Sequence, residues 1–159
     1  MDDAWTLVRF LHLLGVATWV GGLVFLGAIA VPAARADAGP DGARSMITRI
    51  GRRFAVVGGV AWLVILVTGF GLLDQRGLSI SDLPDSDYGR RLLAKIGLLL
   101  ALGVITVVHG AWQGPRVRRA LEAGDGAAAR RWRRAGAALD AVTLVASLAA
   151  LWLGVSLVA

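Results

Sequence analysis

Residues 9–25 read RFLHLLGVATWVGGLVF, an apolar run that contains one arginine and one histidine. With its flanks the run extends from Trp5 to Val31, long enough to cross a bilayer core of about 30 Å as a helix rising about 1.5 Å per residue. A helix in lipid satisfies its own backbone hydrogen bonds, whereas an open strand does not. The stretch therefore predicts a membrane helix that carries two ionisable side chains, Arg9 and His12.

The rest of the chain has the same character. Of its 159 residues, 57% are hydrophobic and 18% are charged, a balance typical of membrane proteins. It has no cysteine, which excludes disulfides and thiolate sites. We expect an all-α, polytopic membrane four-helix bundle, a single integral membrane domain over 1–159. Its predicted spans are Trp5 to Val31, Phe54 to Leu73, Leu92 to Trp112 and Ala135 to Val158.

Arginines concentrate in two of the three connections. The connection from Pro32 to Arg53 holds five arginines and that from Gln113 to Arg134 holds seven, whereas the middle connection contains four aspartates. Positive residues in short loops stay in the cytoplasm. This predicts that both termini lie outside (N-out/C-out) in a bacterial-type plasma (inner) membrane. The basic residues match lipid head groups, so we expect the lipid bilayer, and no nucleic acid, as their partner.

The two basic connections admit two interpretations. Apolar side chains recur at helical spacing among the arginines, and such segments can lie flat on anionic lipid. Alternatively, they are the cytoplasmic ends of the second and fourth helices. The motifs AGPDGAR and AGDGAAAR also suggest turns and a duplication of the two halves. The apolar residues are Met46, Ile47 and Ile50 in the first connection, Phe54 directly after it, and Trp132 in the other basic connection.

Ionisable residues inside a span usually face the bundle interior and are candidates for function. His12 lies about 10 Å below the outer end of the first span, and Lys95 lies at a similar depth in the third. Arg9 is one turn above His12 on the same face, and Asp74 ends the second span nearby. We therefore expect His12, Lys95 and Arg9 to form a site.

A second pair is expected near the cytoplasmic face. His109 lies near the inner end of the third span, and Asp140 enters the fourth from the same side. His12 and His109 differ in depth by about 15–20 Å, which argues against one iron or metal ion held by both. The candidate metal ligands are thus His12 in an outer layer, with His109 and Asp140 in an inner one.

Glycines inside the spans favour close helix packing over phosphate binding, because they lie within apolar helices. Among them are Gly15 and Gly22 in the first span and Gly58 and Gly69 in the second. Trp19 lies deep in the first span, where it either fills the core, the interpretation we favour, or contacts a planar ligand.

The stretch LHLLGVATWVGGLVFL, with His12, Trp19, Gly21 and Gly22, resembles the first helix of small CopD-like membrane proteins. Residues 65–73 (ILVTGFGLL) and 90–110 (RRLLAKIGLLLALGVITVVHG) resemble later helices of this group and of the related HemJ-type haem-binding oxidases. The resemblance covers about three of the four spans. It implies a four-helix membrane bundle with one of two chemistries.

A HemJ-type chemistry implies haem-linked oxidation, with a first-helix histidine and a third-helix lysine that correspond to His12 and Lys95. This sequence departs from that pattern because GGLVFLGAIAVPAAR contains no second histidine. The CopD name implies copper uptake or resistance. Copper(I) prefers methionine and cysteine, and the chain offers only Met1 and Met46, which argues against a methionine-lined path.

Three hypotheses follow. In the first, His12 is an axial ligand of haem b in a redox protein, and Arg9 and Lys95 pair with the propionates. In the second, copper or another ion passes between the outer and inner polar layers, in a homodimer or larger membrane complex because four helices are few for a transporter. In the third, the chain is a non-enzymatic accessory subunit. Whether the chain is an enzyme is left open.

Overall fold

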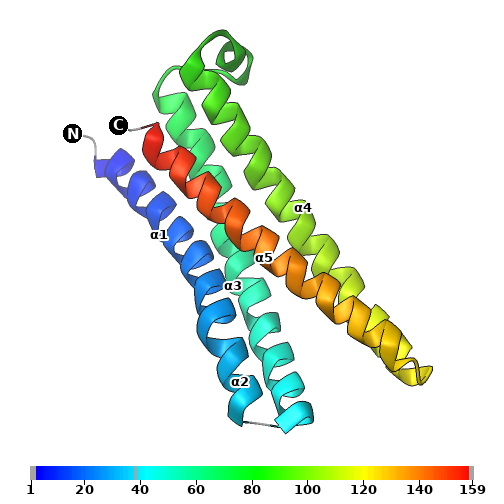
Figure 1. Cartoon of the computed structure of the whole chain (residues 1–159). Helices are drawn as coiled ribbons and strands as arrows, with labels where there is room; N and C mark the ends of the chain where they lie inside the picture. The colour runs from blue at the N-terminus through cyan, green and yellow to red at the C-terminus, as the bar shows by residue number, and fades with distance from the viewer. Residues whose placement is uncertain (1–2, 38, 158–159) are drawn as a thin grey trace. The chain divides into compact units, whose positions relative to one another are not determined.

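The computed structural model describes residues 3–37 and 39–157, with residues 40 and 41 described by their backbone alone. Met1 and Val158, which enter the expectations above, lie outside these residues. The described residues form helices and contain no strand, which confirms the all-α prediction (Figure 1). The elements are α1 (Asp3–Phe25), η1 (Leu26–Ala30), α2 (Val31–Asp37), α3 (Gly39–Gln75), η2 (Ile80–Asp85), α4 (Asp87–Glu122) and α5 (Gly126–Ser156).

Four helices are long and apolar enough to cross a membrane, and they contain the described parts of the four predicted spans except Leu157, which follows the fourth helix. Large aliphatic side chains on their surfaces are widely exposed, including Val67 and Val107 at 71% each. In water such surface would be costly, whereas acyl chains solvate it. The chain divides into two compact units, residues 1–89 and 90–159. The single domain and the outside location of both termini stay predictions.

Unit 1 is a helical hairpin in which α1 and α2 both contact α3. At Gly15 the two backbones approach closely, because a Cβ atom there would lie 3.1 Å from the Ala61 carbonyl oxygen and 3.0 Å from Ile65. A glycine at such a point lets the helices gain van der Waals contact, which replaces the hydrophobic effect as the driving force in lipid. The predicted packing role of Gly15 is confirmed.

An aromatic pair fills the hairpin nearer its basic end. Trp19 is 4% exposed, and its ring centroid lies 6.3 Å from that of Phe54 at an interplanar angle of 37°. The Phe54 ring occupies the space above Gly22 and also contacts Gly58. Two glycines thus make room for two large rings, and the core-filling role predicted for Trp19 is confirmed.

The first span contains a π-helical turn, η1, that the sequence analysis did not predict. Here the Val31 N–H donates to the Leu26 carbonyl, five residues back. Pro32 follows at once; it has no N–H, and in a regular α-helix its ring would collide with the carbonyl of Ala28, four residues earlier. A widened turn immediately before a proline relieves that collision.

This turn shifts the buried face by one residue. Eighteen residues complete five α-helical turns, so an uninterrupted helix would place Ala33 on the same face as Gly15. Instead Ala33 is exposed, and Ala34 is only 2% exposed. Ile29 is likewise 56% exposed, while Ala30 is buried.

The basic segments belong to the long helices. Residues 46–54 lie within α3, which begins at Gly39, and Trp132 lies within α5, which begins at Gly126. This confirms the second interpretation of these segments, helix ends in place of separate surface helices. Arginine and alanine are strong helix formers, and long arginine side chains carry their charge beyond the acyl region. Both turns contain a glycine of positive φ, Gly39 at 62° and Gly124 at 71°.

The connection between α3 and α4 is folded. Ser79 caps η2 in a reciprocal arrangement: its hydroxyl and backbone N–H both donate to the Asp82 carboxylate, and the Asp82 N–H pairs with Ser79. Leu83 is 1% exposed and anchors the segment. Gly89 passes close against the Leu83 carbonyl, where a Cβ atom would not fit.

In unit 2, α4 and α5 form an antiparallel pair with one constant register. Three contacts share this register: Gln113 with Gly136, His109 with Asp140, and Lys95 with Gly154. From one contact to the next, the position on α4 moves back by as many residues as the position on α5 moves forward. Small side chains are buried along α5 at mainly heptad spacing: Ala129, Gly136, Thr143, Ser147 and Ala150. Such a stripe suits close packing in lipid.

Candidate functional site

His12 on α1 is joined to Thr68 on α3. The Nδ1 atom of His12 lies 2.9 Å from the Thr68 hydroxyl oxygen, and that hydroxyl in turn donates to the carbonyl of Val64, one turn earlier on α3. Gly69 provides the space for the ring, since a Cβ atom there would lie 3.4 Å from the imidazole Cε1. The imidazole is therefore held between a hydroxyl and a bare stretch of helix.

The Thr68 hydroxyl has one hydrogen and lies within hydrogen-bond distance of both the Val64 carbonyl oxygen and His12 Nδ1. When that hydrogen goes to Val64, the hydroxyl oxygen accepts from Nδ1–H, and the lone pair of a neutral imidazole lies on Nε2. Metal-binding histidines are commonly held in this way, with one ring nitrogen donating to a partner and the other presenting its lone pair.

Arg9 lies one turn before His12 on α1. Its guanidinium donates to the side-chain oxygen of Gln75, the last residue of α3, at 3.4 Å. Gln75 follows Asp74, the carboxylate expected nearby. The first and second spans thus bring two of the three predicted site residues, Arg9 and His12, to the same end of unit 1.

Lys95 belongs to unit 2. Its ammonium group lies against α5, where a Cβ atom at Gly154 would be 2.8 Å from the Lys95 nitrogen. The side chain is half-buried, so this small residue on α5 makes room for a cation within the third span. The meeting of Lys95 with His12 joins two units and stays a prediction.

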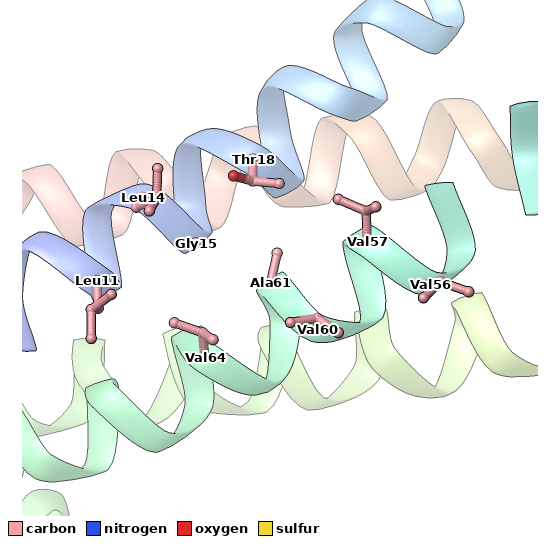
Figure 2. Close-up of a pocket in the computed structure, with 9 residues that line it drawn as sticks. All are labelled: Leu11, Leu14, Gly15, Thr18, Val56, Val57, Val60, Ala61 and Val64. Carbon is pink, nitrogen blue, oxygen red and sulfur yellow. The ribbon is translucent and has the colours of Figure 1, made fainter. Parts of the chain in front are cut away.

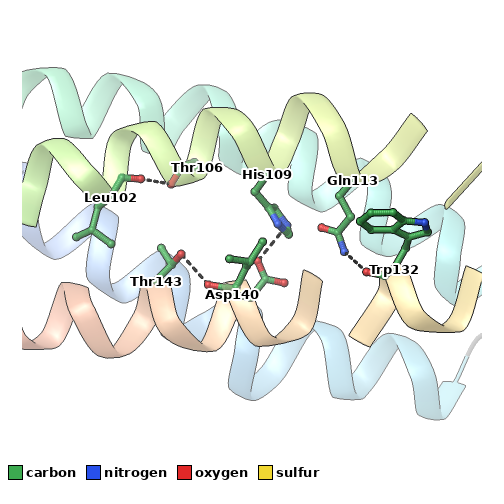
Figure 3. Close-up of polar contacts among 8 residues, drawn as sticks. Leu102, Thr106, His109, Gln113, Trp132, Asp140 and Thr143 are labelled. Atoms are coloured by element: carbon green, nitrogen blue, oxygen red, sulfur yellow. Dashed lines mark hydrogen bonds and ion pairs between the residues drawn. The ribbon is translucent and has the colours of Figure 1, made fainter. Parts of the chain in front are cut away.

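The inner pair forms as predicted. His109 Nε2 lies 3.3 Å from the Asp140 carboxylate, and the two side chains are 24% and 72% exposed. Figure 3 shows His109 pointing from α4 toward Asp140 on α5. The other ring nitrogen, Nδ1, is buried and has no hydrogen-bond partner among the described residues. Their contact is confirmed, whereas a role in metal binding stays a prediction.

Within residues 3–37 and 39–157, no group of three or more His, Cys, Asp or Glu side chains is arranged to hold a metal ion. The candidates His12, His109 and Asp140 therefore do not form a three-ligand site there. An ion at His12 would need ligands of other types, such as hydroxyl, carbonyl, amide or water oxygens.

Unit 1 also carries an open groove of about 330 Å³ between α1 and α3 (Figure 2). Its lining is aliphatic apart from Thr18 and includes Leu11, Leu14, Val60 and Val64. His12 is not part of it, because the groove follows a different side of α1. The groove suits an acyl chain or another apolar helix and offers no polar chemistry.

Sequence reasoning missed Thr68. A signal was available, because Thr68 is the one hydroxyl-bearing residue in the predicted second span, 54–73. A hydroxyl in an apolar helix bonds either to its own backbone or to a partner helix. Here it does both.

Four spanning helices, with cationic, imidazole and carboxylate groups within them, define a polytopic helical membrane protein. Residues 48–155 match the family described as CopD, Copper resistance protein D, and this match covers more than half of the chain. The chain therefore belongs to the CopD family and is a multi-pass membrane protein. No curated protein and no solved structure matches the chain. The relation to HemJ-type proteins stays a prediction.

Proposed function

We propose that the chain handles copper in the inner membrane, with the ion as its cargo and the imidazole of His12 as a ligand. The family description links this group of proteins to copper resistance. The observation that carries the proposal is the Thr68–His12 hydrogen bond, which holds an imidazole inside the span between α1 and α3. Imidazole is a good copper ligand.

The composition favours copper(II) over copper(I) as the species bound. The chain has no cysteine and two methionines, so the soft sulfur ligands that select copper(I) are scarce. Copper(II) accepts nitrogen and oxygen ligands in tetragonal geometry. His12 would supply the nitrogen, with oxygens of neighbouring groups or water completing the coordination.

The two histidines of the chain provide a matched test. Purified protein in detergent is titrated with copper(II), and nitrogen coupling is read from its electron paramagnetic resonance spectrum. We expect a bound species that His12→Ala abolishes and His109→Ala retains. Failure of wild-type protein to bind copper, or equal binding by both variants, contradicts the proposal. Copper accumulation in proteoliposomes then tests transport.

Haem b is the second candidate, and one observation favours it. Arg9 and His12 lie one turn apart on α1, so that an axial ligand and a partner for a propionate would lie on the same face. Copper gains nothing from a nearby guanidinium, whereas a propionate does. His12 would supply one ligand to the iron, and Lys95 is the predicted second cation. When bound, haem supplies one-electron redox chemistry.

The absorption spectrum separates the candidates. A Soret band in freshly purified protein that shifts or disappears in His12→Ala supports haem, and its absence in wild-type protein contradicts it. If neither copper nor haem binds, the accessory-subunit hypothesis is favoured. Co-purification of a partner with the tagged chain from native membranes tests that hypothesis.

A further inference from the structure

Arg116 is held between two indole rings at the basic end of unit 2. Its guanidinium carbon lies 5.1 Å from the ring centroid of Trp112, four residues earlier on α4, and 5.1 Å from that of Trp132 on α5. Cation–π contact with two rings restrains a side chain that is otherwise mobile. A planar set of donors is thereby fixed at the level where tryptophans meet the membrane interface.

The same residues line an open cavity of about 190 Å³, which has room for several water-sized groups. Its polar end contains Arg116 and Gln113, and the Gln113 amide is held by donation to the Trp132 carbonyl at 3.2 Å (Figure 3). Toward the span it is lined by Val108 and Leu139 and also by the imidazole of His109, which pairs with Asp140. Val108 is about 12 Å farther into the span than Arg116, at the rise of an α-helix. The cavity is therefore cationic toward the helix ends, and toward the span it is aliphatic apart from one imidazole.

The charge around this cavity is strongly positive. The segment from Gln113 to Arg134 contains seven arginines and two acidic residues. Both acidic residues are engaged: Glu122 lies 3.4 Å from Arg118, and Asp125 caps α5 by accepting from the Ala128 N–H at 2.8 Å. This end of unit 2 thus attracts anions, as basic pockets between membrane helices do.

We propose that this cavity binds the phosphate group of an anionic phospholipid, with Arg116 as the main contact. The guanidinium matches the phosphate oxygens, the indole rings suit the glycerol level, and the aliphatic end accepts the start of an acyl chain. A free phosphate shares the headgroup chemistry but gains nothing from the apolar end. The site lies in unit 2 and does not involve His12.

The test compares two arginines on one helix. Arg116→Gln removes the charge in the cavity, and Arg118→Gln removes an equal charge two residues away, where the side chain is 71% exposed and paired with Glu122. The full chain in uncharged detergent is unfolded thermally with phosphatidylglycerol, with phosphatidylcholine, or with inorganic phosphate at matched ionic strength. A ligand that binds the folded state raises the midpoint.

We expect phosphatidylglycerol to raise the midpoint of wild-type and Arg118→Gln protein. In Arg116→Gln protein the apparent lipid affinity falls roughly fivefold or more, the worth of one arginine near an anionic surface. An Arg116-dependent shift with inorganic phosphate as large as that with lipid supports the phosphate site and identifies free phosphate as the ligand. Equal losses in both variants, or no shift with either ligand, overturn the proposal.

Two further variants guard against misfolding. Arg116→Lys keeps the charge but loses the planar donors, and Trp132→Leu keeps Arg116 but loses one ring. Both should weaken lipid binding while the midpoint without added lipid stays near that of wild type. Unchanged lipid binding in both variants contradicts the assignment to this cavity.

Discussion

His12 and Thr68 link the two longest apolar stretches of unit 1 through one hydrogen bond of 2.9 Å between the imidazole Nδ1 and the hydroxyl oxygen. The bond crosses from α1 to α3 in a region of otherwise apolar side chains. It sets the ring orientation, so the chemistry proposed for His12 depends on Thr68 as well.

Thr68→Val removes the hydroxyl at nearly constant volume. The Nδ1–H then lacks its acceptor, and an unsatisfied polar group costs about 1–3 kcal/mol in a desolvated position. We expect copper affinity to fall about 10–100-fold, the usual effect of losing such a supporting partner. Thr68→Ser, which keeps the hydroxyl, should bind nearly as wild type. Competition titration with a copper chelator measures both, and unchanged affinity in Thr68→Val would contradict the role of the bond.

Gly15→Ala should destabilise unit 1. Its added methyl group would crowd the Ala61 carbonyl and Ile65 at 3.0–3.1 Å, and overpacking of this kind typically costs about 1–3 kcal/mol. Gly21→Ala is the matched control on the same helix, because nothing lies within 4 Å of the added atom. That variant should be neutral or gain up to about 1 kcal/mol from reduced backbone entropy. Equal unfolding midpoints for the two variants would argue against close packing at Gly15.

The His109–Asp140 pair should show a small positive coupling. The two side chains lie on facing membrane helices, and polar contacts of this kind contribute about 0.6 kcal/mol on average. A double-mutant cycle with His109→Gln and Asp140→Asn, measured by unfolding in detergent, isolates the pairwise free energy. Strict additivity would show that the contact contributes nothing to stability.

Asp82, in the connection outside the spans, provides a pH prediction. Hydrogen bonds from the Ser79 side chain and backbone N–H hold the pKa of the Asp82 carboxyl below its ordinary value. A lowered pKa means that the capped turn is favoured when the carboxyl is ionised. Its contribution is present above the ordinary pKa of about 4 and is lost as pH falls through the lowered value. Carbon-13 NMR of the carboxyl should show this, and Ser79→Ala should move the pKa back up.

If Ser79→Ala left the titration of Asp82 unchanged, the cap would not be its cause. Asp85→Asn is a suitable control, since Asp85 lies in the same connection and takes no part in the cap. It should leave the Asp82 midpoint nearly unchanged.

The four spans were predictable because length and composition alone specify a helix in lipid. The His109–Asp140 contact was predictable too, because counting residues inward from a short turn places both at one depth on antiparallel helices. Such counting works in α4 and α5, where the register is constant along the contacts. Counting residues gives the depth of a side chain in the membrane, whereas the direction in which the side chain points depends on how the helix is rotated about its axis.

Other features depend on contacts that a single sequence does not reveal. Thr68 is one hydroxyl among apolar residues, and its partner on α1 becomes evident only when it is known which faces of α1 and α3 contact each other. The extent of α3 was underestimated because arginines were assigned to a connection, although they are sound helix formers. The π turn before Pro32 was missed because a proline near a span end is also compatible with simple termination.

The π turn at Leu26–Ala30 makes the first span behave as two rods set at different rotational phases. The contacts of Gly15 and Trp19 before the turn and those of Ala30 and Ala34 after it therefore need not share one regular helical face. Deletion of one residue from the π turn would give a regular α-helix, and both sets of contacts would still face α3. Deletion of one residue between His12 and the π turn would instead rotate His12 away from Thr68. A one-residue deletion should therefore be tolerated better within the π turn than before it.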